Sequence, residues 1–275
     1  MARNESEDMI KICSLFSGSS GNCIYVSYNG TSILIDAGVS GRRIEAALRD
    51  IGESLDNISG IFITHEHSDH INGAGIISRR HKIPIYANTE TWEAMRPFLG
   101  KLQSEHVRCI EVGEEKTIGD ITVRSFPIPH DAVCPVGYNI FIAGKKLTIA
   151  TDIGHMNDRL LSCLEKSDMI LLESNHDLEM LRTGRYPWPL KRRIMSDYGH
   201  LCNDIAGEVV AHLAQCGTKR FLLGHLSQEN NLPELAYRTA FNALMDKKIN
   251  PVKDVYLEVA LRDRASSVMC IGTGA

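Results

Sequence analysis

The chain has 275 residues, of which 43% are hydrophobic and 23% charged, with 30 basic and 34 acidic side chains and a net charge of −4. These fractions are typical of a globular protein and exclude a disordered chain or a coiled coil. No apolar run approaches the roughly 18 residues that a membrane span requires, and the start, MARNESEDMI, lacks the apolar stretch of a signal peptide. The slight negative charge argues against a protein that coats nucleic acid through bulk charge, although local basic patches can still bind phosphates.

Eight cysteines are scattered along the chain without a CxxC pair. In a sequence with no export signal, this pattern favours free thiols in a reducing compartment over a disulfide framework. No linker, repeat or change of composition divides the sequence, and α/β folds of this length often form one unit. We therefore predict a cytoplasmic enzyme with no membrane partner, in which residues 1–275 form a single domain.

Short apolar runs typical of β-strands recur along the chain and alternate with helical patterns. The predicted strands are residues 10–16, 23–28, 32–35, 60–64, 83–87, 121–128, 137–142, 146–150, 169–173 and 220–223. The predicted helices are residues 44–51, 92–99, 205–213 and 235–246. Thr89 is a candidate cap for the second of these helices, and Asn203 with Asp204 for the third. The pattern predicts a mixed β-sheet with flanking helices.

The segment GIFITHEHSDHINGAG, residues 60–75, concentrates potential metal ligands. Directly after an apolar strand, His65, His67, Asp69 and His70 fall within six positions. Around this turn, His65 and His67 can point at one ion while Asp69 and His70 point toward a second. Imidazole and carboxylate ligands suit zinc, manganese or iron. The alternative is a polar surface loop with chance histidines, which seldom places such a run directly behind an apolar strand.

Other His and Asp residues also stand just after short apolar strands. They are Asp36, His130, Asp152, His176 and His225. Binding sites of α/β sheets lie beyond the carboxyl ends of the strands, so we expect these side chains to converge on one edge. One such residue alone would usually be structural. Five in the same relation to five strands favour a site for two metal ions.

With these motifs, the sequence resembles the metallo-β-lactamase superfamily from its first strands to His225. Asp36 matches the first family motif, residues 65–70 match the signature HxHxDH, and His130, Asp152 and His225 match the third to fifth motifs. The resemblance implies the α/β class and a four-layer αββα sandwich, with the site on one edge of the two sheets. It also implies that Asp36 orients a ligand histidine and that Asp152 bridges two divalent ions. The remaining ligands that it implies are His65, His67 and His130 for one ion, and Asp69, His70 and His225 for the other.

Three further segments resemble the YycJ/WalJ group of this superfamily. They are SLFSGSSGNCIYV, LLESNHD and GHLCNDIAGEVV, with Cys202 where Ser is expected. Members are described as DNA exonucleases that work from 5′ ends, with links to DNA repair. His67 stands where oxygen-reducing members carry Glu, which favours hydrolysis over redox chemistry, and a cytosolic location argues against a lactam substrate. The resemblance therefore implies a phosphodiesterase that is a 5′-to-3′ DNA exonuclease.

The expected mechanism uses a hydroxide shared by the two ions to attack phosphorus, with Asp69 orienting it. A general acid must then protonate the departing 3′ oxygen. His200 is the first candidate, because related phosphodiesterases place a non-ligand His at a comparable point; the alternative is a helix-capping role. His176 is the second candidate, supported by Glu173 and Asn175, against a role in shaping the rim.

Two segments are candidates for binding the substrate. In the loop of residues 17–22, Ser19, Ser20 and backbone N–H groups can cradle a phosphate, although a tight turn needs the same glycines. The run GRYPWPLKRR interleaves aromatic and basic side chains, which suits single-stranded nucleic acid; solvated charge in a proline-rich loop is the alternative. Its cations are Arg185, Lys191, Arg192 and Arg193.

Two other functions stay open at this level. One is hydrolysis of a small phosphodiester or thioester by the same metals, which a closed pocket without a basic track would favour. The other is a metal-binding regulatory protein without catalysis, whose partner binding would persist after its ligands are replaced. DNA is the preferred partner, because the basic and aromatic run suits a polymer.

Overall fold

The computed structural model describes residues 9–273. Most of the N-terminal segment MARNESEDMI, namely residues 1–8, lies outside the described residues. Within residues 9–273 no helix is long and apolar enough to cross a membrane. All eight cysteines lie in this range, and each of them is free. That residues 1–275 form one domain stays a prediction.

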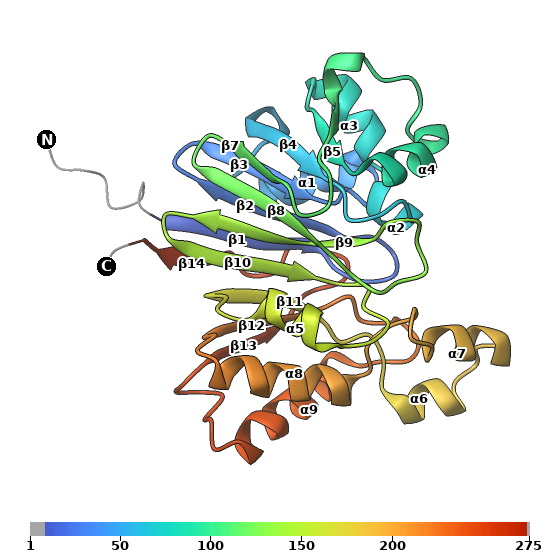
Figure 1. The fold of residues 1–275 in the computed structure, drawn as a ribbon, viewed down its shortest axis with the longest axis vertical. Helices are drawn as coiled ribbons and strands as arrows, with labels where there is room; N and C mark the ends of the chain where they lie inside the picture. Colours follow the sequence, from blue (N-terminus) through green and yellow to red (C-terminus); the bar gives the residue numbers. More distant parts are fainter. Residues whose placement is uncertain (1–8, 274–275) are drawn as a thin grey trace, which may run out of the picture.

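Two seven-stranded mixed sheets face each other in the middle of the molecule (Figure 1). The first sheet has the order β14-β1-β2-β3-β4-β5-β6, and the second has the order β13-β12-β11-β10-β9-β8-β7. The first comprises β1 (Met9–Phe16), β2 (Cys23–Tyr28), β3 (Thr31–Ile35), β4 (Ile58–Phe62), β5 (Ile85–Ala87), β6 (Val107–Cys109) and β14 (Met269–Gly272). The second comprises β7 (Glu115–Ile118), β8 (Ile121–Pro127), β9 (Val136–Ile142), β10 (Lys145–Ala150), β11 (Met169–Glu173), β12 (Arg220–Gly224) and β13 (Tyr256–Val259).

Each sheet combines antiparallel hairpins with a parallel part. The strands β1 to β3 pair antiparallel, whereas β3 to β6 pair parallel. In the second sheet β7 to β10 pair antiparallel, whereas β10 to β13 pair parallel. The carboxyl ends of parallel strands meet at one edge of a sheet, and residues that follow such strands can therefore converge on one site.

Helices cover the outer face of each sheet. Over the first sheet lie α1 (Gly41–Asp50), α3 (Ala74–His81) and α4 (Thr89–Leu99), and over the second lie α5 (Asp158–Leu164), α8 (Asn203–Gln215) and α9 (Pro233–Asp246). The side chains of β1 point alternately to the two faces of the sheet and so belong to two hydrophobic cores. Ile10 and Ile12 pack between the sheets, while Cys13 and Leu15 pack with the helices. The four layers confirm the predicted αββα sandwich.

Shorter elements gather at one end of the sandwich. They are α2 (Ser68–Ile71), α6 (Leu178–Thr183) and α7 (Trp188–Ile194), at the right of Figure 1. Two 3-10 turns, η1 (Leu55–Asn57) and η2 (Ser104–His106), connect strands of the first sheet.

All ten predicted strands are present, but β6, β7, β13 and β14 were not predicted. The predicted helix caps are wrong by one residue. Asn88 rather than Thr89 caps α4, since its side chain accepts a hydrogen bond from the Thr91 amide at 2.8 Å, while the Thr89 hydroxyl donates to Glu111. Cys202 occupies the N-cap of α8.

Candidate metal centre

The turn that follows β4 and the short helix α2 together hold four of the expected ligands on a fixed backbone, and we call this segment the ligand loop. The Asn22 amide donates to the Asp69 carbonyl, and the Ala37 amide donates to the His70 carbonyl, each at 2.8 Å. Gly38 allows the close approach, because a Cβ there would lie 1.6 Å from the Asp69 carbonyl oxygen. The loop that follows β3 therefore packs directly on the ligand loop and orders it.

His65, His67 and His130 form the first cluster, a group of three imidazoles. The Nδ1 atom of His67 lies 3.1 Å from His65 Nε2 and 3.4 Å from His130 Nε2. His130 Nδ1 donates to the Gly199 carbonyl at 3.1 Å, which leaves its Nε2 with a free lone pair. The three nitrogens lie within 4.8 Å of one another, so this cluster can hold a metal ion.

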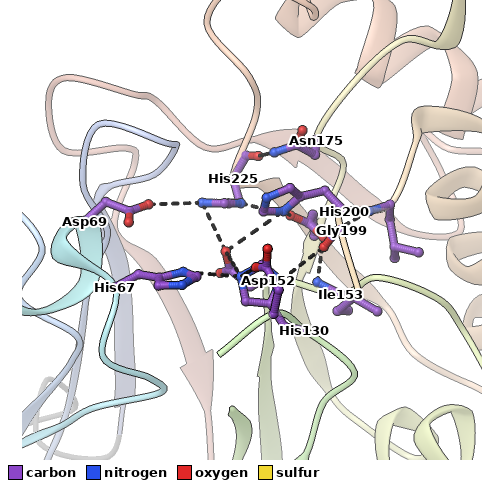
Figure 2. Close-up of polar contacts among 12 residues, drawn as sticks. His67, Asp69, His130, Asp152, Ile153, Asn175, Gly199, His200 and His225 are labelled. Atoms are coloured by element: carbon purple, nitrogen blue, oxygen red, sulfur yellow. Dashed lines mark hydrogen bonds and ion pairs between the residues drawn. The ribbon is translucent and has the colours of Figure 1, made fainter. Parts of the chain in front are cut away.

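Asp69, His70 and His225 form the second cluster, in which a carboxylate joins two imidazoles. Asp69 Oδ2 lies 3.6 Å from both His70 Nε2 and His225 Nε2. Figure 2 shows Asp69 and His225 pointing toward each other from opposite sides of the centre. Their ligand atoms also lie within 4.8 Å of one another and can hold a second ion.

Asp152 lies between the two clusters (Figure 2). Its Oδ1 is 3.5 Å from His225 Nε2 and 3.7 Å from His130 Nε2, while its Oδ2 is 3.4 Å from His70 Nε2. Asp152 Oδ2 and His225 Nε2 are buried, and neither has a hydrogen-bond partner among residues 9–273. Buried polar atoms are costly when unpaired. This set of nitrogen and carboxylate donors therefore fits divalent metal ions.

Two buried carboxylates orient the ligand histidines from behind. Asp36 Oδ2 accepts from His70 Nδ1 at 2.7 Å, and Asp36 also accepts from the backbone and hydroxyl of Thr64, each at 2.8 Å. Glu173 Oε1 accepts from His225 Nδ1 at 2.8 Å and from His200 Nδ1 at 2.7 Å. Each bond holds a proton on Nδ1, so that Nε2 is the nitrogen of each ring that faces the centre and can bind metal once its own proton is lost.

Strained backbone places three of these side chains. Asp36, Asp152 and His225 have φ values of 60°, 61° and 55°, in the left-handed region that non-glycine residues rarely adopt. They lie just beyond the ends of β3, β10 and β12. Such strain costs on the order of 1–3 kcal/mol per residue and collects at functional sites. The strained turns redirect these side chains toward the shared edge of the sandwich.

The pKa values differ between the two clusters. Burial, together with the neighbouring His70 and His130, lowers the pKa of His65 well below its usual value, and burial also lowers that of His130. Burial opposes protonation of His70 too, but the carboxylates of Asp152, Asp36 and Asp69 outweigh it and raise its pKa to about 9.

The carboxylates of the centre respond in the opposite sense. Burial alone would raise the pKa of Asp69 and Asp152, but the adjacent imidazoles, His70 and His225 among them, hold both pKa values below the usual range. Both groups are therefore ionised at neutral pH, as metal ligands must be.

His200 lies beside the clusters. Its ring centroid is 5.1 Å from that of His130 and 5.3 Å from that of His225, and 18% of its side chain is exposed. Because Nδ1 donates to Glu173, Nε2 is the nitrogen that is left to contact a ligand. A plain helix-capping role is not what the structure shows, since Cys202 occupies the N-cap of α8.

His176 is buried and is not among the groups of candidate ligands. The expected support from Glu173 and Asn175 is wrong: Glu173 bonds His200 and His225, and the Asn175 amide donates to the His225 carbonyl at 2.9 Å (Figure 2). The role of Glu173 beneath the centre was missed. The signal was present, because Glu173 ends an apolar strand just as the other site residues follow one.

The loop of residues 17–22 joins the centre through Ser17, whose hydroxyl accepts a hydrogen bond from the His225 amide at 2.8 Å. Asn22 Nδ2 lies 3.1 Å from His70 Nε2. Ser19 and Ser20 are exposed at the tip of this loop. The loop therefore contacts the second cluster and presents the two serines to solvent.

The expected basic side chains divide into two kinds. Arg185, Arg192 and Arg193 are exposed, and Arg193 pairs with Asp131, the neighbour of His130. Lys191 instead is buried, and its ammonium group donates to the carbonyls of Arg182 and Gly184, each at 2.7 Å. Lys191 therefore ties α7 to the end of α6 and is withdrawn from a substrate surface.

A four-layer αββα sandwich with adjoining His and Asp clusters at the sheet edge defines a protein of the metallo-β-lactamase fold. A family model described as "Beta-lactamase superfamily domain" matches residues 31–226, and the chain therefore belongs to this superfamily. It is 43% identical over 233 residues to exodeoxyribonuclease YycJ of Bacillus anthracis, covering 85% of this chain and 88% of the relative. It is 44% identical over 241 residues to exodeoxyribonuclease WalJ of Streptococcus pneumoniae, covering 87% and 90%.

The solved structures share the fold at much lower identity. Zinc-bound PqqB from Methylobacterium extorquens superimposes with a TM-score of 0.67 at 18% identity, covering 94% of this chain and 99% of that one. This similarity confirms the fold class independently of the sequence motifs.

Proposed function

We propose that this protein is a metal-dependent exodeoxyribonuclease that hydrolyses DNA from 5′ ends. The observation that carries the proposal is the pair of adjoining clusters, with Asp152 between them and buried ligand atoms without partners among the described residues. The relation to two exodeoxyribonucleases over most of the chain supports DNA as the substrate. The free cysteines fit a reducing compartment, so a cytoplasmic location is part of the proposal.

In this proposal each cluster holds one divalent ion, zinc or manganese, with iron as a further option. His65, His67 and His130 hold the first ion, Asp69, His70 and His225 hold the second, and Asp152 serves both. When bound, such a pair supplies Lewis acidity and a nucleophile derived from water at neutral pH. Asp36 and Glu173 keep the second-cluster histidines in the tautomer that binds metal.

Asp69 is proposed to orient the attacking water as well as to bind metal. Its side chain is 22% exposed, the most open carboxylate of the centre, against 4% for Asp152. Its depressed pKa keeps it ionised, so that it accepts a hydrogen bond from the nucleophile. The exposure of its side chain supports a role for Asp69 on the solvent side of the second cluster.

His200 is proposed as the general acid that protonates the departing 3′ oxygen. The Glu173 carboxylate accepts its Nδ1–H at 2.7 Å, which leaves the other ring nitrogen for the reacting bond. His176 Nδ1 has no such partner among the described residues, which supports His200 as the first candidate for the acid.

The basic surface near α7 is proposed to hold the DNA strand. Exposed Trp188 (56%) and Tyr198 (60%) lie in the same segment as the exposed arginines. Arginines can bind phosphates while the aromatic rings stack on bases. Ser19 and Ser20 are proposed to contact a phosphate on the other side of the centre. The cations proposed here are Arg185, Arg192 and Arg193.

The test is a time course on 5′-phosphorylated, 3′-labelled single-stranded DNA with manganese or zinc. We expect progressive shortening from the 5′ end, and its loss in Asp69→Asn. Asp246→Asn makes the same substitution at an exposed position of α9, away from both clusters, and is expected to leave the time course unchanged. Shortening only from the 3′ end would overturn the proposed polarity, and intact DNA in the metal-loaded protein would overturn the nuclease.

A further inference from the structure

A pocket of about 570 Å³ adjoins the metal centre on the side of α8. His200 lines it, so the pocket and the centre share one side chain. Much of its wall is apolar, and the side chains that form this part are Met156, Leu161, Met195, Ile205 and Val209. The volume and the apolar lining are typical of pockets that enclose most of a small organic ligand.

His176 forms part of the same wall and is 1% exposed. Its Nδ1 is buried and has no hydrogen-bond partner among residues 9–273. The other histidines of the pocket have partners: His155 bonds the Asp197 carbonyl at 2.8 Å, His200 bonds Glu173, and His212 bonds Glu165 at 3.1 Å. An unpaired buried nitrogen is costly. His176 is thus an unpaired polar group in the wall of the pocket, and a small side-chain movement would let it bond to a ligand there.

The charges of the pocket favour a neutral ligand. Among the described residues that line it, none is Lys or Arg, and Glu208 is a carboxylate. Such a lining offers no Lys or Arg to a phosphate, which the exposed arginines of the α7 segment suit better. Burial lowers the pKa of His176 to about 4, so its ring is neutral and offers one donor and one acceptor. A planar heterocycle with polar edges matches apolar walls and one unpaired imidazole.

We infer that this pocket binds the nucleobase of the nucleotide next to the scissile phosphate, with His176 hydrogen-bonding to the base. The inference rests on the proposed nuclease function for the identity of the ligand. Continuity with the centre supports it, because the ring proposed to protonate the leaving oxygen also lines the pocket. Apolar side chains against the base faces and a hydrogen bond to its edge are how enzymes hold a single base.

The test compares small chromogenic diesters with and without a base. The probes are the p-nitrophenyl esters of thymidine 5′-phosphate and thymidine 3′-phosphate, each paired with its abasic deoxyribose counterpart. We expect the metal-loaded enzyme to prefer the base-bearing form of one ester by about tenfold or more in kcat/KM, the size typical of a stacked base. Which ester shows the preference identifies the side of the phosphate that the pocket serves.

Ile205→Trp fills the pocket from a position that is 38% exposed, and it is expected to bring the preference close to one. Met245→Trp adds similar bulk at an exposed position of α9 outside the pocket and is expected to keep the preference. His176→Phe retains a ring without nitrogens and is expected to lower the preference severalfold. The preference that remains in the His176→Phe variant should then depend on the apolar faces of the base and no longer on its polar edge.

The outcomes separate the two proposals. A base preference on a diester, abolished by Ile205→Trp, together with intact DNA would support the pocket and overturn the nuclease. Degraded DNA with equal rates for base-bearing and abasic diesters would overturn the pocket and leave the nuclease. A preference that survives Ile205→Trp would also overturn the pocket.

Discussion

The two clusters of the metal centre differ in the groups that surround them. The first, His65, His67 and His130, consists of imidazoles, and burial lowers the pKa of two of its members. The second includes Asp69, and the carboxylates of Asp36 and Glu173 lie behind its histidines. His65 and His130 of the first cluster are thus neutral and ready to bind metal. The second cluster is a network of charged groups, and a metal ion has to displace protons from its histidines to bind there.

This difference shows how one edge of a sandwich can hold two ions with different supports. The ligand loop of the first sheet contributes to both clusters, while the second sheet contributes His130 to one and His225 to the other. Asp152 is the residue close to both, and it follows a central strand of the second sheet. The predictions below separate the two clusters, starting from the residue that joins them.

The largest effect is expected for Asp152→Ala. Removing the carboxylate between the clusters should release at least one ion and lower DNA hydrolysis by at least about 10³-fold, because a bound metal supplies several kcal/mol of charge stabilisation. Metal content by mass spectrometry and the DNA time course measure this, and circular dichroism checks that the variant folds. Retention of both ions would rule out the bridging assignment.

His200→Ala is expected to lower the rate on DNA by about 10²- to 10⁴-fold, the range for a lost general acid. Both clusters should keep their ions, since His200 is not one of the proposed ligands. A p-nitrophenyl diester needs little help from an acid, so its hydrolysis should fall much less. Equal losses on DNA and on the chromogenic ester would contradict the general-acid role.

Asp36→Asn and Glu173→Gln test the supports of the second cluster. Each removes a carboxylate that accepts a hydrogen bond from a ligand histidine. Each should therefore lower the affinity for the second ion by about 10- to 100-fold. The first ion should be retained, which titration with a chelating dye can resolve. Glu173→Gln should also slow DNA cleavage more than Asp36→Asn, because Glu173 holds His200 as well.

Binding of the second ion should release protons at pH 7.5. The pKa of His70 is raised to about 9 and that of His225 lies well above its usual value, so both rings are protonated below these values until metal displaces the protons. Calorimetry in two buffers of different ionisation enthalpy should detect about two protons, and fewer as the pH rises toward 9. If the protons were released on binding of the first ion instead, the proposed difference in protonation between the two clusters would be wrong.

The smallest effect is expected at the basic surface beside the first cluster. Arg192→Ala should weaken DNA binding and reduce the salt slope by about one, as expected when one phosphate contact is lost. Arg238→Ala, on α9, is the matched control and should leave the slope unchanged. Fluorescence anisotropy over a series of salt concentrations measures both. Equal slopes for Arg192→Ala and wild type would exclude Arg192 from the proposed DNA surface.

The sequence predicted much of this protein because its signals are local. Ten apolar strands were predicted from their composition, and the run from His65 to His70 marks the ligand loop by its residue types alone. The strands that were not predicted have weak local patterns. Most of β7 is exposed, and β6, β13 and β14 are each only three or four residues long. Their pairing depends on neighbours that are distant in the sequence.

Side-chain partners could not be predicted in the same way, because they depend on which loops meet. Glu173 was expected beside His176 through proximity in sequence, yet it contacts His225, 52 residues later. Lys191 belongs to a basic run, yet the packing of α7 against α6 buries its ammonium group on two carbonyls. Charge in a sequence shows what a side chain can bind, and tertiary contacts decide what it does bind.

The sequence by itself thus determined the ligand types, the strands that carry them and the edge at which they meet. Hydrophobic alternation and residues placed after strands are properties of the chain that need no partner. Only the tertiary structure decided how Asp152 lies between the clusters, which carboxylate supports which histidine, and that His176 faces a pocket instead of the metal centre. These relations are set by distances between segments far apart in the chain, fixed only when the two sheets pack face to face.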